Sequence, residues 1–299
     1  MSVQRRVQRL RSSTAYPASS DASARTASQR RGMTIKIPQR VPSPPTVCAR
    51  TQAHAPLFNP PSCCCCTRLA EAAPLIQRLG LVEDPSKFSS GAPCKCFSGV
   101  YQGAEVNVVT NGKCKRFGVD HIGTVAGGLC TWLSVEVLKP DLVINAGTAG
   151  GFKKHDTAIG DVFISTRVRN HDRRIPIPGF REYGVGDHES HPTPEMVKSL
   201  EFKTGVVTTG SSFDHTEMDD KIMEENEARV KDMEAAAVAW ACEQHGTPVF
   251  CVKVVTDLVD GDGVGEEEFL QNLKAASEAL QDALPKILDF ILERSLTDL

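Results

Sequence analysis

The sequence predicts an α/β domain with a basic extension in front of it. Short apolar runs alternate with helical stretches from Leu69 to the end of the 299-residue chain, a pattern typical of a sheet covered by helices. The first 66 residues hold ten of the 34 Lys and Arg residues but only one of the 37 acids, Asp21. We therefore place the extension at residues 1–66 and the folded domain at residues 67–299.

The extension is rich in Ser, Arg, Ala and Pro, and we expect it to be disordered because it has too little apolar periodicity to offset the entropy of ordering. Its basic, almost acid-free composition resembles a transit peptide, and the alternative is a non-native segment without function. Its arginines are scattered without interleaved aromatic residues, which argues against nucleic-acid binding. We expect a cytoplasmic protein, or a plastid one if the extension directs import.

Eleven cysteines raise the question of disulfides or a metal site. Cys63 to Cys66 are contiguous and cannot wrap a tetrahedral ion, and Cys94 and Cys96 are too close together for a C-x-x-C pair. No apolar segment suggests secretion, and no apolar run approaches the ~18 residues that span a membrane. We expect reduced thiols, no metal, no cofactor and no membrane partner.

In the first half of the domain, turn and helix-stop signals define the predicted elements. Gly80 and Pro140 each stop a helical stretch, and Gln102 and Gly103 join two strand-like runs as a hairpin. The predicted elements are a helix at 70–79, hairpin strands at 97–101 and 105–110, a helix at 119–138, a buried strand at 142–146 and a loop at 147–151.

The second half continues the alternation and brings two acids to the ends of elements. Glu234 stands in the first turn of an apolar helix that Gly246 ends, and Asp257 follows a β-branched strand. Pro285 is expected to kink or break the last helix. The predicted elements are strands at 161–168 and 205–209, a charged helix at 216–230, a strand at 249–255 and a helix at 266–294.

Several polar residues collect where strands end, which is where open α/β sheets bind ligands. Glu234 and Glu71 are either functional acids or acids that complement a helix dipole. Asp257 is either functional or a turn former. The loop at 147–151 either approaches a phosphate or sugar hydroxyl or is an ordinary tight turn.

A charged segment and an aromatic residue can each be interpreted in two ways. Residues 171–176, HDRRIP, form a charged cluster that is either a loop held by ion pairs or part of a ligand site or interface. Phe213 follows a strand and is either a core residue or a stacking surface.

Four segments, in this order, resemble one family. They are NAGTAGGF at 145–152, HDRRIP at 171–176, VKDMEAAAV at 230–238 and VTDLVDG at 255–261. Over about residues 69–299 the chain resembles the plant-type 5′-methylthioadenosine/S-adenosylhomocysteine nucleosidases of the nucleoside phosphorylase superfamily. The resemblance implies that superfamily's three-layer fold, a central mixed, twisted sheet flanked by helices. It also implies hydrolysis of methylthioadenosine to adenine and 5-methylthioribose in methionine salvage, and leaves open whether S-adenosylhomocysteine is accepted.

The resemblance assigns roles to nine residues and implies a homodimer with the segment from His171 to Pro178 near the interface. Asp257 would be the general acid at adenine N7, and Glu71 would activate water. Glu234, with the Met233 backbone, would bind the ribose hydroxyls. The other implied substrate-binding residues are Thr148 near the ribose and water, Phe213 and the Asp214 backbone at adenine, Ile122 at the methylthio group, and Gly150.

The chain departs from the family at the first strand, where the family has an apolar strand ending in Ala-Met. Pro60 and Pro61 cannot donate in a central ladder, so residues 62–67 form at best a short substitute strand. Arg68, in place of the methionine, would put a cation close to Glu71. Two alternatives therefore stay open. One is a catalytically impaired or storage-type relative, and the other is a phosphorylase, although residues 147–151 have no adjacent cation before Lys153 to clamp phosphate.

Overall fold

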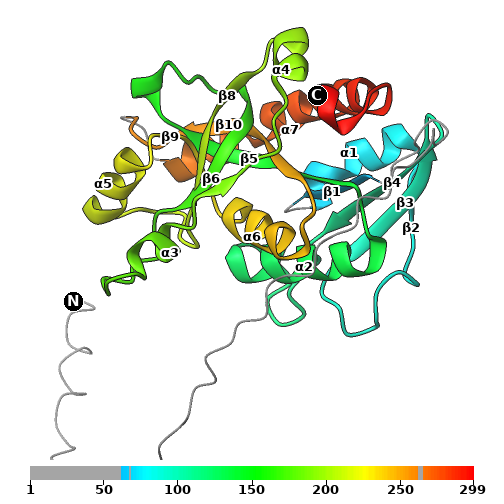
Figure 1. Cartoon of the computed structure of the whole chain (residues 1–299), viewed down its shortest axis with the longest axis horizontal. Coiled ribbons are helices and arrows are strands. Elements are labelled where there is room, and N and C mark those ends of the chain that lie inside the picture. Colours follow the sequence, from blue (N-terminus) through cyan, green and yellow to red (C-terminus); the bar gives the residue numbers. More distant parts are fainter. Residues whose placement is uncertain (1–61, 67–68, 262–264) are drawn as a thin grey trace, which may run out of the picture. The chain divides into compact units, whose positions relative to one another are not determined.

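The computed structural model describes residues 62–66, 69–261 and 265–299, and in them one mixed sheet is covered by helices (Figure 1). The predicted fold class is confirmed. The strands are β1 Ser62–Cys66, β2 Val82–Glu83, β3 Lys95–Tyr101, β4 Ala104–Thr110, β5 Leu142–Gly151, β6 Val162–Asn170, β7 His188–Glu189, β8 Lys203–Thr209, β9 Ala228–Asp232 and β10 Val249–Leu258. The helices are α1 Leu69–Leu79, α2 Thr124–Leu138, α3 Arg181–Val185, α4 Pro194–Leu200, α5 Glu217–Glu225, α6 Ala235–His245 and α7 Gly265–Leu292, with short 3-10 turns at Lys153–His155 and Leu296–Asp298.

Five strands of the sheet close on themselves. β10 pairs in parallel with β5 and antiparallel with β6, and the path from β6 returns to β5 through β8 and β9. Gly150 on β5 pairs with Lys231 on β9 and with Asp257 on β10. The carboxyl ends of three strands that are distant in sequence therefore meet at one place.

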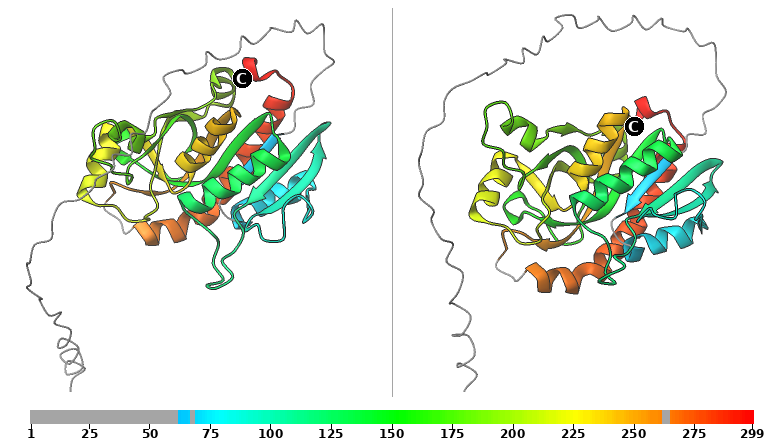
Figure 2. Two further views of the ribbon diagram at one scale, coloured as in Figure 1. Left: turned by 60° about the horizontal axis from the view of Figure 1, so that its bottom comes forward. Right: turned by 90° about the horizontal axis from the view of Figure 1, so that it is seen from below.

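Alternate residues of the central strands face two separate helical layers (Figure 2). On β5, Leu142 and Ile144 pack with residues of α1 and α7, whereas Val143 packs with residues of α2 and α6. On β10, Val252 belongs to the first layer and Cys251 to the second. Since side chains of a strand alternate between its faces, this period of two builds the three-layer domain.

The short substitute strand is present as β1. Its backbone pairs in parallel with β4 on one side and with β5 on the other, so that Cys64 lies opposite Val108 and Ile144. Every residue from Ser62 to Cys66 has a backbone N–H, because the prolines come before them. These five residues, assigned above to the extension, are therefore part of the sheet. Residues 1–61 and Arg68 lie outside the described residues, and the predictions about them stay predictions.

The predicted loop at 147–151 is wrong, because β5 continues through it. The small residues of this segment allow neighbouring strands to lie close together, and they do not form a turn. A Cβ on Gly150 would lie 2.8 Å from Val259 Cγ2 and 2.9 Å from Asp257 Oδ2. The strand thereby carries Thr148 and Gly150 beside the end of β10.

Three predicted helices need correction, whereas the predicted hairpin and the other strands and helices are confirmed within a few residues. α2 begins at Thr124 rather than at residue 119, because Gly123 has a φ of 90° that a helix does not accommodate. α5 ends at Glu225, and the following residues form β9, whose Val230 is fully buried. α7 runs through Pro285, so the helix does not break there, since apolar residues on both sides of Pro285 pack into the core, and the alternative of a kink stays a prediction.

We expect the replacement of Cys64 by proline to lower the free energy of unfolding by about 3 kcal/mol or more, because it removes a donor from a strand with neighbours on both sides. Cys64→Val keeps the donor and should change stability by less than about 1 kcal/mol. Denaturant unfolding followed by circular dichroism measures both variants. Wild-type stability of the proline variant would show that residues 62–66 are not a central strand.

Candidate active site

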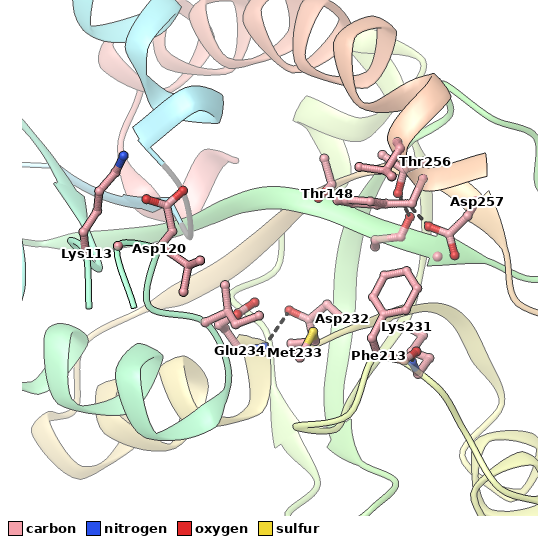
Figure 3. A pocket seen from close by; sticks show the side chains of 17 residues that line it. Lys113, Asp120, Thr148, Phe213, Lys231, Asp232, Met233, Glu234, Thr256 and Asp257 are labelled. Atoms are coloured by element: carbon pink, nitrogen blue, oxygen red, sulfur yellow. Dashed lines mark hydrogen bonds between the residues drawn. The ribbon is translucent and has the colours of Figure 1, made fainter. Parts of the chain in front are cut away.

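A cavity of about 750 Å³ lies where the carboxyl ends of β5, β9 and β10 meet (Figure 3). Figure 3 places Asp257 and Phe213 at one end, Glu234 and Met233 in the middle, and Lys113 and Asp120 at the other end. Seven of the nine predicted site residues line this cavity: Ile122, Thr148, Gly150, Phe213, Met233, Glu234 and Asp257.

Asp257 is an 8% exposed residue inside β10, so the turn-forming alternative is wrong. Its Oδ1 accepts a hydrogen bond from Thr256 Oγ1 at 2.8 Å. Burial raises the pKa of Asp257, although the Thr256 hydroxyl and the Lys231 ammonium act in the opposite direction. A carboxyl with a raised pKa keeps its proton to higher pH, which suits a general acid.

Glu234 directly precedes α6 and is 5% exposed. Its Oε1 accepts a hydrogen bond from the N–H of Gly123, the residue before α2, at 2.7 Å. Burial and the nearby Asp232 carboxylate raise the pKa of Glu234 to about 7, with a smaller contribution from Glu71 and opposition from Lys253 and the Gly123 N–H. Glu234 is thus a buried acid that faces the cavity.

The side chain that caps the start of α6 is that of Asp232 and not that of Glu234. Its Oδ2 accepts the N–H groups of Ala235 at 2.8 Å and Glu234 at 3.3 Å. Thr209 Oγ1 donates to Asp232 Oδ1 at 2.6 Å and accepts the N–H of Ala236 at 2.9 Å. Two side chains therefore satisfy the start of α6, and the Glu234 carboxylate does not serve this helix.

A buried ion pair that we did not predict from the sequence supports this cap. Lys253 on β10 is 0% exposed, and its Nζ lies 2.8 Å from Asp232 Oδ2. Burial alone would lower the pKa of Lys253, but the electrostatic effects of Asp232, Cys251 and Glu234 together outweigh it, and the pKa is raised above its usual value. The available signal was a single lysine inside the apolar run from Val249 to Val255, because a buried lysine requires a partner.

Glu71 lies in the first turn of α1 and is 1% exposed. Its Oε1 accepts a hydrogen bond from Thr148 Oγ1 at 2.9 Å. Glu71 is not among the lining residues of the cavity but adjoins it through Thr148. Its charge contributes to the raised pKa of Glu234, so the two acids are neighbours.

Phe213 forms an aromatic wall at the Asp257 end of the cavity, so the core alternative is wrong. Its side chain is 39% exposed, and its ring centroid lies 5.6 Å from that of Phe269 in an edge-on contact. Lys231 is another residue of the site that we did not predict from the sequence. Its Nζ donates to the carbonyl oxygens of Ser212 at 3.2 Å and Phe213 at 2.5 Å. Asp214 is exposed and is not among the lining residues.

The cluster at 171–176 is a loop held by an ion pair and hydrogen bonds. Arg174 pairs with Asp219 and also donates to the His171 carbonyl at 3.3 Å. Burial and the Lys231 ammonium lower the pKa of His171 to about 4, so the ring is neutral near pH 7. The position of this loop near a subunit interface stays a prediction.

Among residues 62–66, 69–261 and 265–299, no three His, Cys, Asp or Glu side chains are grouped so that they could hold a metal ion. Within the same ranges, every helix is too short or too polar to cross a membrane.

Comparisons with known proteins show which proteins the chain is similar to. The model of the phosphorylase superfamily matches residues 64–289. A 5′-methylthioadenosine nucleosidase of Arabidopsis thaliana is 46% identical over 231 residues, which are 77% of this chain and 86% of that protein. A 5′-methylthioadenosine/S-adenosylhomocysteine nucleosidase of the same organism is 44% identical over 230 residues, 77% of this chain and 91% of that protein. The structure of Arabidopsis thaliana 5′-methylthioadenosine nucleosidase in apo form matches with a TM-score of 0.79 at 44% identity, over 80% of this chain and 99% of that chain.

We expect Glu234→Gln to gain stability relative to wild type as the pH rises from 5 to 8. The pKa of Glu234 is about 7 in the folded protein and near 4.5 when unfolded, so the folded state holds the extra proton and wild-type stability falls over this range. The gain should be roughly 2 kcal/mol in the free energy of unfolding. Denaturant titrations at both pH values measure it, with Glu136→Gln on the exposed face of α2 as the control. A difference independent of pH would contradict the buried, raised-pKa carboxyl.

Proposed function

The chain belongs to the methylthioadenosine nucleosidase family of the phosphorylase superfamily, and we propose that it hydrolyses the N-glycosidic bond of 5′-methylthioadenosine to adenine and 5-methylthioribose. One observation carries the proposal: three acids surround one cavity, with Asp257 at its end, Glu234 in its middle and Glu71 behind Thr148. Glycosidic hydrolysis requires an acid at the leaving group, a base for water, and negative charge near the oxocarbenium-like carbon.

The order of the lining residues along the cavity supports one orientation of the nucleoside. Adenine stacks on Phe213 with its N7 toward Asp257. A contact of the Asp214 backbone with the base stays a prediction, because Asp214 does not line the cavity. The ribose hydroxyls reach Glu234 and the Met233 backbone, which leaves the 5′ substituent toward Ile122, another residue that lines the cavity.

Departure of the base uses the proton on Asp257. The C1′–N9 bond breaks with its electron pair remaining on adenine, and Asp257 donates its proton to N7, so the base leaves neutral. The raised pKa of Asp257 favours the protonated form that this step needs. Gly150 allows the carboxyl to lie close against β5, because any Cβ there would meet Asp257 Oδ2 at 2.9 Å.

Attack by water uses Glu71. The water oxygen forms the new bond to C1′, and Glu71 accepts the proton, which later returns to Asp257 through solvent. Thr148 Oγ1 donates to Glu71 Oε1 at 2.9 Å and so orients the carboxylate at the cavity wall. Glu234 accepts the ribose hydroxyls and opposes the positive charge that develops on the sugar.

Phosphate is a poor nucleophile for this cavity. The Glu234 carboxylate lies near those of Asp232 and Glu71, whose charges raise its pKa and would repel a phosphate dianion. The two lysines that line the cavity, Lys113 and Lys231, stand at opposite ends of it and cannot clamp one anion together (Figure 3). Hydrolysis is therefore favoured over phosphorolysis.

A catalytically impaired or storage-type relative would be expected if the altered first strand displaced Glu71. β1 is paired on both sides, and Glu71 is 1% exposed and bonded to Thr148, which supports an active enzyme. From the reaction we propose a role in methionine salvage. We propose the cytoplasm as the location, or a plastid if the basic residues 1–66 direct import.

We propose a homodimer with the segment from His171 to Pro178 near its interface. Ile177 is 57% exposed, and Phe180 and Tyr183 just beyond the segment are 51% and 53% exposed. A second apolar group lies on α2 and α6, where Val125 is 84% exposed. Clusters of exposed apolar side chains mark association surfaces.

Asp257→Asn should lower kcat for adenine release from methylthioadenosine by about 10²–10⁴-fold, because it removes the transferable proton. Asp260→Asn, three residues on and exposed, is the matched control and should retain wild-type kcat. Activity of the full chain is measured with and without phosphate, and thermal unfolding checks that both variants fold. Near-normal turnover by the Asp257 variant would refute the assignment of the acid, and a strict requirement for phosphate would refute hydrolysis.

Sedimentation should give a dimer for wild type and a shift toward monomer for Ile177→Asp, because a charge in an apolar interface is costly to bury. Ile159→Asp, at a 41% exposed position, is the control and should remain dimeric. If Val125→Asp alone produces monomers, the interface lies on α2 and not at residues 171–178.

A further inference from the structure

Lys231 lines the cavity beside Phe213 and Asp257, and the reaction proposed above gives its side chain no role (Figure 3). Lys231 is 7% exposed. Its backbone pairs with Thr208 on β8 and with Gly150 on β5. A lysine at such a buried position loses hydration that its neighbours have to replace. Its ammonium group therefore needs fixed partners in this part of the cavity.

The ammonium group of Lys231 fastens the turn that follows β8. Its Nζ donates to the carbonyl oxygens of Ser212 at 3.2 Å and Phe213 at 2.5 Å. In the part of the chain that the structure describes, Ser212 and Phe213 take part in no other hydrogen bond. A single side chain from β9 therefore ties these two residues to the sheet.

The Phe213 ring depends on Lys231 more than on the start of the turn. Ser211 N–H donates to Asp172 Oδ2 at 2.6 Å, but this bond lies two residues before the ring. The ring itself has an edge-on contact with Phe269, at 5.6 Å between centroids. Lys231 Nζ lies over the ring, 5.7 Å from its centroid, where a cation is attracted to an aromatic face. Lys231 thus holds both the backbone and the ring of Phe213.

The same ammonium group acts on Asp257 through its charge. Lys231 on β9 and Asp257 on β10 both pair with Gly150, so no side chain of β5 separates them. Burial raises the pKa of Asp257 most, and the Glu268 carboxylate on α7 adds to this. The Thr256 hydroxyl and the Lys231 ammonium lower it. Loss of the positive charge would therefore raise the pKa of Asp257 further.

The surroundings of Lys231 favour its charged form. Burial lowers the pKa of Lys231, and four carboxylates oppose this decrease: those of Asp257, Asp214, Asp232 and Asp219. An ammonium group has three N–H donors, and carbonyl oxygens accept from it here. The group is thus a cation held in one place by the backbone of the turn.

We propose that Lys231 is a positioning residue for the departure of adenine: it holds the Phe213 ring where the base stacks, and it keeps a positive charge beside the acid that protonates the base. Lys231 acts through Phe213 and Asp257 rather than on a reacting atom. A carboxyl that burial alone controlled would release its proton less readily, and the nearby charge offsets this. The inference rests on the proposed function, because it uses the same orientation of adenine.

Substitutions of Lys231 in the full-length protein test the positioning of the base. Lys231→Met removes the donors and the charge, and we expect KM for methylthioadenosine to rise about tenfold because the stacking surface is no longer fastened. Lys231→Arg keeps both and should recover most of the loss. Lys221→Met, on α5 and outside the cavity lining, makes the same change in net charge and should keep the wild-type KM. Thermal unfolding checks that each variant folds.

The pH dependence of kcat separates positioning from a merely structural role. Without the charge of Lys231, Asp257 keeps its proton to higher pH. The ratio of kcat for Lys231→Met to wild-type kcat should therefore increase by about threefold to tenfold between pH 5 and 8. Glu234 also titrates in this range, but Lys231 is not among the groups that shift its pKa, so its effect cancels in the ratio. The ratio for Lys231→Arg should not change with pH. A ratio for Lys231→Met that is independent of pH would overturn the inference.

Failure of this inference is distinguishable from failure of the proposed function. Calorimetric titration with adenine alone needs no turnover, and Lys231→Met should weaken binding of adenine about tenfold relative to wild type and to Lys221→Met. Equal affinity of wild type and Lys231→Met for adenine would overturn the inference and leave hydrolysis standing. Weaker binding by Lys231→Met, in a protein that does not hydrolyse methylthioadenosine, would support the positioning of the base and refute the proposed reaction.

Discussion

The carboxylate of Asp232 is the group on which the geometry of the site depends. It ends β9, accepts a hydrogen bond from Thr209 on β8 at 2.6 Å, accepts the first N–H of α6 from Ala235 at 2.8 Å, and pairs with Lys253 on β10 at 2.8 Å. Three strands and a helix are joined through one buried group. Removing one partner of such a buried pair leaves an uncompensated charge and typically costs about 3–5 kcal/mol, so the network is expected to resist deformation when a ligand binds.

This network separates two tasks that an acid at a helix start can perform. Asp232 satisfies the helix terminus, so Glu234 keeps its carboxylate for the cavity although burial raises its pKa to about 7. Holding Glu234 near Asp232 and Glu71 is unfavourable in the empty protein, because like charges repel at short range in a poorly solvated site. In the proposed reaction, a positive charge that develops on the ribose would relieve that repulsion. In the proposed mechanism the site is thus complementary to the state in which the glycosidic bond is breaking, which is the condition for catalysis.

The parts of the site that sequence could predict are those whose signals are local. Glu234 before an apolar helix, Gly246 after it and Asp257 at the end of a β-branched run depend on short-range patterns, and the structure places these residues accordingly. The Asp232–Lys253 pair joins residues that are 21 positions apart, so no local pattern relates them. We did not predict that β5 extends through Gly151, because a glycine-rich segment is typical of a turn. Here the segment is a strand because β9 and β10 pair with it. The first three residues of β9 were predicted as the end of a helix because they continue the polar pattern of α5, and only the burial of Val230 between neighbouring strands favours a strand there.

In the proposed reaction, water attacks the sugar at a site built from Asp257, Glu234 and Glu71. Hydrolysis of methylthioadenosine in ¹⁸O-labelled water, with phosphate present and the products analysed by mass spectrometry, tests it most directly. We expect one ¹⁸O on the anomeric hydroxyl of methylthioribose, none in adenine, and no dependence of the rate on phosphate. Methylthioribose 1-phosphate as the sugar product, with no incorporation of the label from water, would contradict it.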